Sequence, residues 1–174
     1  MIYKETQKFR QTWLWVILGI TGLIVTGIFA YGFYIQIIEG EEFGNNPMSD
    51  NTLIIVFIST VIFFILLFSL FVMAKLITVI DQNGIEYRFF PFHLNAHRIN
   101  WEVVERYEVV KYNPVLEYGG WGIRYGFKGK AYNVSGNKGL RLFLKNGRNI
   151  ILGTQRDIEL TEFLRNLFDE KKKK

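Results

Sequence analysis

Two uninterrupted apolar segments, Trp13–Tyr34 and Leu53–Ala74, constrain this chain more than any other feature of its sequence. Each segment is 22 residues long and contains no Asp, Glu, Lys, Arg or His. A helix of that length spans about 33 Å, enough to cross a hydrocarbon layer of about 30 Å. A helix on the surface of a soluble core needs a polar face, and neither segment has one. The sequence therefore predicts a hairpin of two transmembrane helices.

The charges that flank the two segments predict their orientation. Residues 1–12 contain Lys4, Lys8 and Arg10, whereas the connecting loop 35–52 contains four acidic side chains and no Lys or Arg. The positive-inside rule then places both ends of the hairpin in the cytoplasm and the acidic loop outside. The first segment also resembles a signal peptide, but it exceeds the usual apolar length of roughly 7–15 residues and no small-x-small site follows it, so we expect no cleavage.

Small side chains lie along one face of the first apolar segment, at Gly19, Gly22, Thr26 and Ala30. Small residues allow a second helix to approach closely. We expect this face to pack against the second segment, with homo-oligomerisation as the alternative. The lack of ionisable side chains in both segments argues against an ion or proton pathway.

The sequence of residues 75–170 predicts one compact, mainly-β domain of about seven short antiparallel strands and a C-terminal helix. Asn83-Gly84 and Asn146-Gly147 each separate two strand candidates, a pattern typical of type I′ hairpins. Trp101–Tyr112 is ambiguous between a helical turn and a strand. Thr154 and Asp157 form a capping-box pattern ahead of the final helix. That helix carries an apolar stripe formed by Leu160, Phe163, Leu164, Leu167 and Phe168.

The order of these elements, and several short stretches of sequence, resemble bacterial membrane proteins that carry a pleckstrin-homology-like (PH-like) domain. The stretches are residues 119–124, 131–134, 139–147 and 152–156. The resemblance implies a PH-like barrel or bent sheet closed by a terminal helix, located at the bacterial inner (cell) membrane, with no established common activity. Eukaryotic PH domains bind phosphoinositides through basic residues around their first hairpin. The corresponding stretch here, Asp81–Gly84, has no Lys or Arg, which argues against such a site.

We found no pattern that predicts catalysis, a metal or a cofactor. The chain has no Cys, so disulfides and thiolate sites are excluded. His93 and His97 are four residues apart, but Pro91 and the β context argue against a helix that would let them share a metal. Gly120-Trp121-Gly122 does not continue as a dinucleotide-binding fingerprint.

One group of basic and aromatic residues is a candidate surface for a protein partner or for anionic lipid headgroups. Its members are Trp121, Arg124, Tyr125, Lys128, Lys130, Arg141 and Lys145. Residues 75–174 carry a net charge of +7 and residues 1–74 one of −2.

The sequence thus predicts the following organisation: a cytoplasmic N-terminus (1–12), a first span (13–34), an external acidic loop (35–52), a second span (53–74), a cytoplasmic PH-like domain (75–170) and a basic tail (171–174). The expected function is a non-enzymatic, membrane-anchored interaction or scaffold module with a protein partner. The alternatives are a module that binds anionic lipid and an accessory subunit of a larger membrane complex. We expect no nucleic-acid partner.

Overall fold

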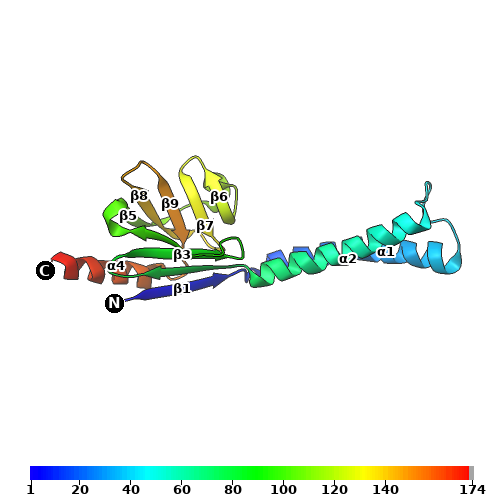
Figure 1. Cartoon of the computed structure of the whole chain (residues 1–174), viewed down its shortest axis with the longest axis horizontal. Coiled ribbons are helices and arrows are strands. Elements are labelled where there is room, and N and C mark those ends of the chain that lie inside the picture. Colours follow the sequence, from blue (N-terminus) through cyan, green and yellow to red (C-terminus); the bar gives the residue numbers. More distant parts are fainter. Residues whose placement is uncertain (173–174) are drawn as a thin grey trace. The chain divides into compact units, whose positions relative to one another are not determined.

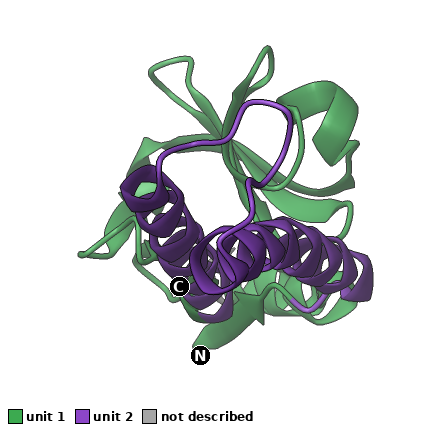
Figure 2. Cartoon of the chain, turned by 90° about the vertical axis from the view of Figure 1, so that its right-hand side faces the viewer, with its two compact units in different colours: residues 1–9, 73–174 green, residues 10–72 purple. Residues whose placement is uncertain are grey.

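The computed structural model describes the backbone of residues 1–172 and the side chains of residues 1–169. The chain folds into two compact units (Figure 2). Residues 10–72 form one, which we call the helical unit; residues 1–9 and the chain from Met73 onward form the other, which we call the β unit. The side chains of the predicted basic tail, 171–174, lie outside the described residues.

The helical unit consists of α1 (Thr12–Phe33) and α2 (Asp50–Met73). A π-helical turn, η1 (Tyr34–Glu39), continues α1 and ends at Gly40, whose φ of 77° is in the left-handed region. Thr12–Glu39 and Asp50–Met73 are both long and apolar enough to cross a membrane, and few of their side chains are buried. The prediction of two long apolar helices is confirmed. Their ends differ from the predicted ends by up to three residues, if the π-helical turn that extends α1 is not counted.

The two helices contact each other through small and aromatic side chains. A Cβ atom at Gly22 would lie 3.2 Å from the ring of Phe64, so the helices approach closely at this position. The rings of Trp15 and Phe68 are 6.1 Å apart. The Gln36 side-chain amide donates to the Met48 carbonyl and to the Asp50 carboxylate, both at 2.7 Å. These bonds fix the loop between the helices.

Four strands form the first sheet, in the order β1-β2-β3-β4. They are β1 (Tyr3–Lys8), β2 (Lys75–Ile80), β3 (Gly84–Phe90) and β4 (His97–Asn100), and every neighbouring pair is antiparallel. The sequence predicts residues 1–12 to lie outside the domain, whereas Tyr3–Lys8 pair with β2 along its whole length. The inward positions of β1 include the polar Glu5 and Gln7, so the apolar alternation that identifies a strand is missing. The helical unit is therefore inserted between two adjacent strands.

Five strands form the second sheet, in the order β5-β8-β9-β7-β6. They are β5 (Val104–Lys111), β6 (Gly122–Gly126), β7 (Gly129–Asn133), β8 (Lys138–Leu144) and β9 (Asn149–Gly153). Residues 75–170 thus contain eight strands, where the sequence predicts about seven, and β1 brings the described chain to nine. The expectation of a wholly antiparallel arrangement was wrong, because β7 and β9 pair in parallel. The β8–β9 hairpin lies between β5 and β7, and in this position β9 is the neighbour of β7 and runs in the same direction. The strands of the two sheets cross at a steep angle (Figure 1).

Two short helical segments connect these strands. The ambiguous stretch 101–112 resolves into a 3₁₀ turn, η2 (Trp101–Val103), followed by β5. The second is α3 (Pro114–Tyr118), which we did not predict. Asn113 caps it by accepting hydrogen bonds from two backbone amides, and Gly119 ends it with a φ of 75°. Asn-Pro before the helix and Gly after it are ordinary helix signals that the sequence contains.

The main core of the β unit lies between the facing sides of the two sheets and α4 (Asp157–Lys172). Leu160, Leu164 and Leu167 of α4 are buried, and Phe163 and Phe168 pack at the margin of this core, as the predicted stripe requires. The Phe168 ring lies 4.8 Å from that of Tyr107 and 5.0 Å from that of Trp101. The Phe163 ring lies 5.6 Å from that of Tyr3 in β1, so the terminal helix contacts both sheets.

The turns differ from the predicted type. Both Asn-Gly hairpins form, but no non-glycine residue described has a positive φ, which excludes type I′ turns. In the first, the Asp81 carboxylate accepts from the amides of Asn83 and Gly84. In the second, Gly147 alone has a positive φ, 78°. Thr154 does not cap α4 as predicted; it donates to Glu5 instead and accepts from the amide of Arg156.

Candidate interaction surfaces

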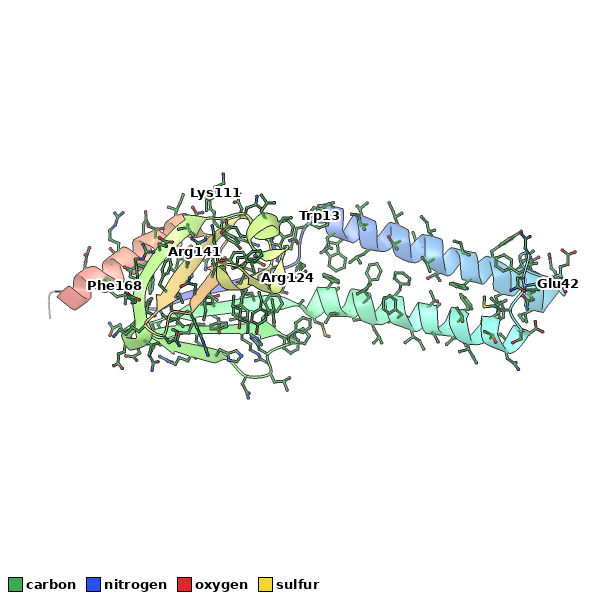
Figure 3. All side chains as sticks on the ribbon, turned by 90° about the horizontal axis from the view of Figure 1, so that it is seen from above. Trp13, Glu42, Lys111, Arg124, Arg141 and Phe168 are labelled. Carbon is green, nitrogen blue, oxygen red and sulfur yellow. The ribbon has the colours of Figure 1, made fainter. Side chains whose placement is uncertain are left out.

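The seven residues of the predicted basic and aromatic surface do not form one surface. In the register of the second sheet, Arg124 of β6 and Arg141 of β8 lie on the outer face, in one row with Ala131 and Ile151. Three strand spacings, about 14 Å, separate the backbones of these two arginines. Figure 3 shows both of them. Tyr125 and Lys130 face the opposite side of the same sheet, where the strands contribute to the main core.

Two of the predicted cations are neutralised by one carboxylate. Glu117 of α3 lies 3.0 Å from the Lys128 ammonium and 3.3 Å from the Arg141 guanidinium. Arg141 is also paired with Glu108 at 3.4 Å, and its side chain is 17% exposed. The backbone amide of Asn113, Lys128 and Arg141 together hold the pKa of Glu117 below its ordinary value. Arg141 therefore stabilises the fold and offers little free charge to a ligand.

The remaining predicted residues also make local contacts. The Trp121 indole donates to the Gly136 carbonyl, and Arg124 donates through Nε to the Trp121 carbonyl, both at 2.9 Å. Lys130 lies over the rings of Tyr125 and Tyr132, 4.8 Å from each centroid. Lys145 is exposed in the β8–β9 turn. In the order of the sheet, β9 separates β8 from β7 and β6, which carry Lys130 and Arg124.

The structure brings His93 and His97 together, with ring centroids 4.3 Å apart. They lie at the junction of the two sheets, beside Tyr87 of β3 and Tyr132 of β7, whose rings are 4.7 Å apart. Burial, His97 and Lys130 lower the pKa of His93 below 6.5, its ordinary value. Within the described residues no group of three or more His, Cys, Asp or Glu is arranged to hold a metal ion.

Large apolar side chains of α3 and the β6–β7 hairpin are exposed. We call three of these residues the apolar patch: Val115, Leu116 and Phe127, which are 54%, 80% and 106% exposed. Tyr125 is 77% exposed but lies on the other face of the sheet from α3, which packs against Ala131 and Ile151. A Cβ atom at Gly126 would collide with the Glu117 carbonyl oxygen, so α3 packs directly on this hairpin. The ion pair between Glu117 and Lys128 also joins the two elements. Sequence reasoning missed α3 and therefore missed this patch.

A groove of about 500 Å³ lies within the helical unit, between α1 and α2. Its lining includes three of the predicted packing residues, Gly19, Gly22 and Thr26. Gly22 meets Phe64, whereas the space next to Gly19 is open. The small residues thus admit the second helix at one position and leave a cavity beside it.

No protein-family model matches the sequence. No curated protein matches it either. The resemblance to PH-like membrane proteins therefore stays a prediction, and what the chain does has to be inferred from its own surfaces.

Proposed function

We propose that the protein is a membrane-anchored interaction module without enzymatic activity. In this proposal α1 and α2 cross the bacterial cell membrane, and the β unit is a PH-like domain that holds a protein partner on the cytoplasmic side. The proposal is supported by the two apolar helices, by the pairing of β1 with β2 and by the apolar patch.

The pairing of β1 with β2 limits the possible topologies. β1 precedes α1 and β2 follows α2, and the two strands pair residue by residue from Tyr3 to Lys8. If both helices cross the membrane, both ends of the hairpin are therefore on the same side. The basic residues around the hairpin and the acidic loop 35–52 favour the cytoplasm for that side. Strand pairing thus supports ends on one side of the membrane independently of the charge rule, and the charge rule alone favours the cytoplasm for that side.

The apolar patch is the observation that carries the interaction role. The core of the β unit is filled by residues from both sheets and α4, so the three side chains of the apolar patch are not needed to complete it. Clustered apolar side chains in water are unfavourable and mark protein contact sites. Aromatic residues are also enriched in protein interfaces. Phe127 and Leu116 are the two most exposed members and would contribute most area to a partner.

Photo-crosslinking in native membranes tests this role. A photoreactive amino acid replaces Phe127, or Leu116, in the full-length chain, and the matched control replaces Asn146, an exposed residue in the β8–β9 turn. We expect a discrete crosslinked protein from the first two positions and none from the control. Crosslinks to a second copy of the chain would identify a homo-oligomer, and crosslinks to a larger complex an accessory subunit. The absence of a discrete product at both patch positions would contradict the proposal.

A further inference from the structure

We propose that the end of the first sheet that is joined to the helices contacts anionic lipid headgroups of the membrane that those helices enter. The contact surface, which we call the juxtamembrane patch, comprises Lys8, Lys75, Arg88, Phe90, Phe92 and Leu94. The inference rests on the proposed membrane anchoring and adds a lipid ligand to it.

Strand register brings the basic residues of the patch together. Lys8, Lys75 and Phe90 form one row across β1, β2 and β3, on the outer face of the sheet. Arg88 lies on the same face in the next row, two residues along β3, at a spacing of about 7 Å. The Phe90 ring is 5.7 Å from the Lys75 ammonium and 5.3 Å from the Arg88 guanidinium. Two cations from adjacent strands therefore flank the Phe90 ring, and Lys8 lies beside Lys75 in the same row.

The described residues of the protein do not neutralise these cations. Within the described part of the chain, none of Lys8, Lys75 and Arg88 forms an ion pair. Arg88 donates through Nε to the His93 carbonyl at 3.1 Å, which holds its guanidinium in place. At the other end of the same face, Arg98 is paired with Asp81 and Glu86. The positive charge is thus concentrated at the end joined to the helices.

Chain connectivity, which does not depend on how the two units are arranged, fixes the position of this patch. Lys75 is two residues beyond the last residue of α2, Met73, and Lys8 is four residues before the first residue of α1, Thr12. At no more than about 3.5 Å per residue, the Cα atoms lie within about 7 Å and about 14 Å of the helix ends. Long Lys and Arg side chains at this distance reach phosphate groups at the membrane surface.

The turn after β3 adds apolar side chains to the basic ones. Phe92 and Leu94 are 60% and 77% exposed, and both follow Phe90 in a turn next to the row that contains Lys75. The Phe92 ring packs 6.0 Å from that of Phe89, which positions the turn. Exposed apolar side chains beside cations are typical of segments that lie at the headgroup layer. The cations would also attract an acidic protein, but binding of such a protein would not require them to lie next to the helix ends.

The test uses the full-length chain, whose lack of Cys allows a single reporter site. The variant Phe92→Cys carries a polarity-sensitive fluorophore and is reconstituted in vesicles of phosphatidylcholine alone or with phosphatidylglycerol. We expect a blue-shifted emission, quenched by spin-labelled lipid, that is stronger with phosphatidylglycerol and weakens with salt. Leu94→Cys serves as a second reporter and should behave alike.

Charge variants assign the effect to the patch. Each cation near an anionic surface should favour contact about five-fold, so Lys8→Gln, Lys75→Gln and Arg88→Gln combined should shift the contact equilibrium about 100-fold. The charge-retaining set Lys8→Arg, Lys75→Arg and Arg88→Lys should keep the response. The control replaces three other exposed cations with Gln, namely Lys111, Lys145 and Arg148, and should also leave it intact.

Several outcomes would overturn the inference. Emission that is the same in both lipids, or a response that survives the triple Gln substitution, excludes this patch as a headgroup site. A fluorophore that responds only when a soluble acidic protein is added shows that the cations serve a protein ligand. Labelling of Glu42→Cys only from the side on which the β unit of the same molecules lies shows that the helices do not cross the vesicle membrane. In that case the membrane-anchoring proposal fails separately.

Discussion

Glu5 is a buried carboxylate that connects the first strand with the segment leading into the last helix. It accepts hydrogen bonds from the Tyr3 hydroxyl at 2.6 Å, the Thr154 hydroxyl at 2.7 Å and the Gln155 amide at 2.8 Å. Burial and the hydrogen bond to Glu5 raise the pKa of Tyr3. Glu5 is 5% exposed, and its three donors compensate for the water that its carboxylate loses on burial.

Glu5→Ala tests this role. The substitution leaves three donors without their acceptor, so we expect the free energy of opening the first sheet to fall by roughly 3 kcal/mol. Hydrogen exchange of the β2 amides in the full-length protein measures it. The control Thr6→Ala, at an exposed neighbouring position, should change this free energy by less than about 0.5 kcal/mol. Equal protection in Glu5→Ala and in the wild-type chain would contradict the role.

The pKa of His93 predicts a pH dependence of stability. Because folding lowers this pKa below 6.5, the unfolded chain binds more protons between the folded value and 6.5. The contribution to stability is complete above 6.5 and is lost as the pH falls through that range. We expect thermal unfolding of the protein in micelles to show a smaller decrease between pH of about 7.5 and about 5.5 in His93→Asn than in wild type. Carboxylates titrate in both proteins and cancel in the comparison. An identical decrease would show that His93 is not responsible.

At the scale of elements, the sequence predicts most of β2 to β9 because their inward positions alternate with polar ones or are bounded by glycine turns. Leu140, Leu142 and Leu144 are the plainest example, and all three are buried. The predictions that were wrong depend on partners distant in the sequence. β1 is recognisable only through its pairing with β2, and the predicted basic surface split because the register places neighbouring residues on opposite faces.

The apolar stripe of α4 allows a matched pair of substitutions. Leu164 is 2% exposed in the core, whereas Ile158 on the same helix is 72% exposed. Leu164→Ala should lower the free energy of unfolding of the β unit by about 2–5 kcal/mol, because it leaves a cavity that the core fills only partly. Ile158→Ala should lower it by less than about 0.5 kcal/mol. Urea unfolding of the full-length chain in micelles measures both, and similar midpoints for the two variants would place α4 outside the cooperative core.

At the scale of the whole molecule, the helical unit takes the place of a hairpin loop between β1 and β2. Paired residues of adjacent strands lie about 5 Å apart at their Cα atoms, so a short linker can join Phe9 to Met73. We expect a chain with residues 10–72 replaced by a few Gly and Ser residues to give a folded, soluble β unit. A fragment that begins at Lys75 lacks β1 and Glu5, and we expect it to unfold or aggregate. Circular dichroism and size-exclusion chromatography distinguish the two, and a well-folded monomer from the fragment would contradict this account.

The pairing of β1 with β2 also has a consequence for synthesis of the protein. β1 leaves the ribosome before either helix, and its neighbour in the sheet is made only after both helices. We expect the nascent β1 to wait unpaired until the second helix has been inserted. A chain in which only one of the two helices crosses leaves β1 on the other side of the membrane from β2, and its sheet then lacks an edge and the Glu5 hydrogen bonds. Completion of the first sheet would thus act as a check on membrane insertion, and chains that fail it would be open to quality-control proteases.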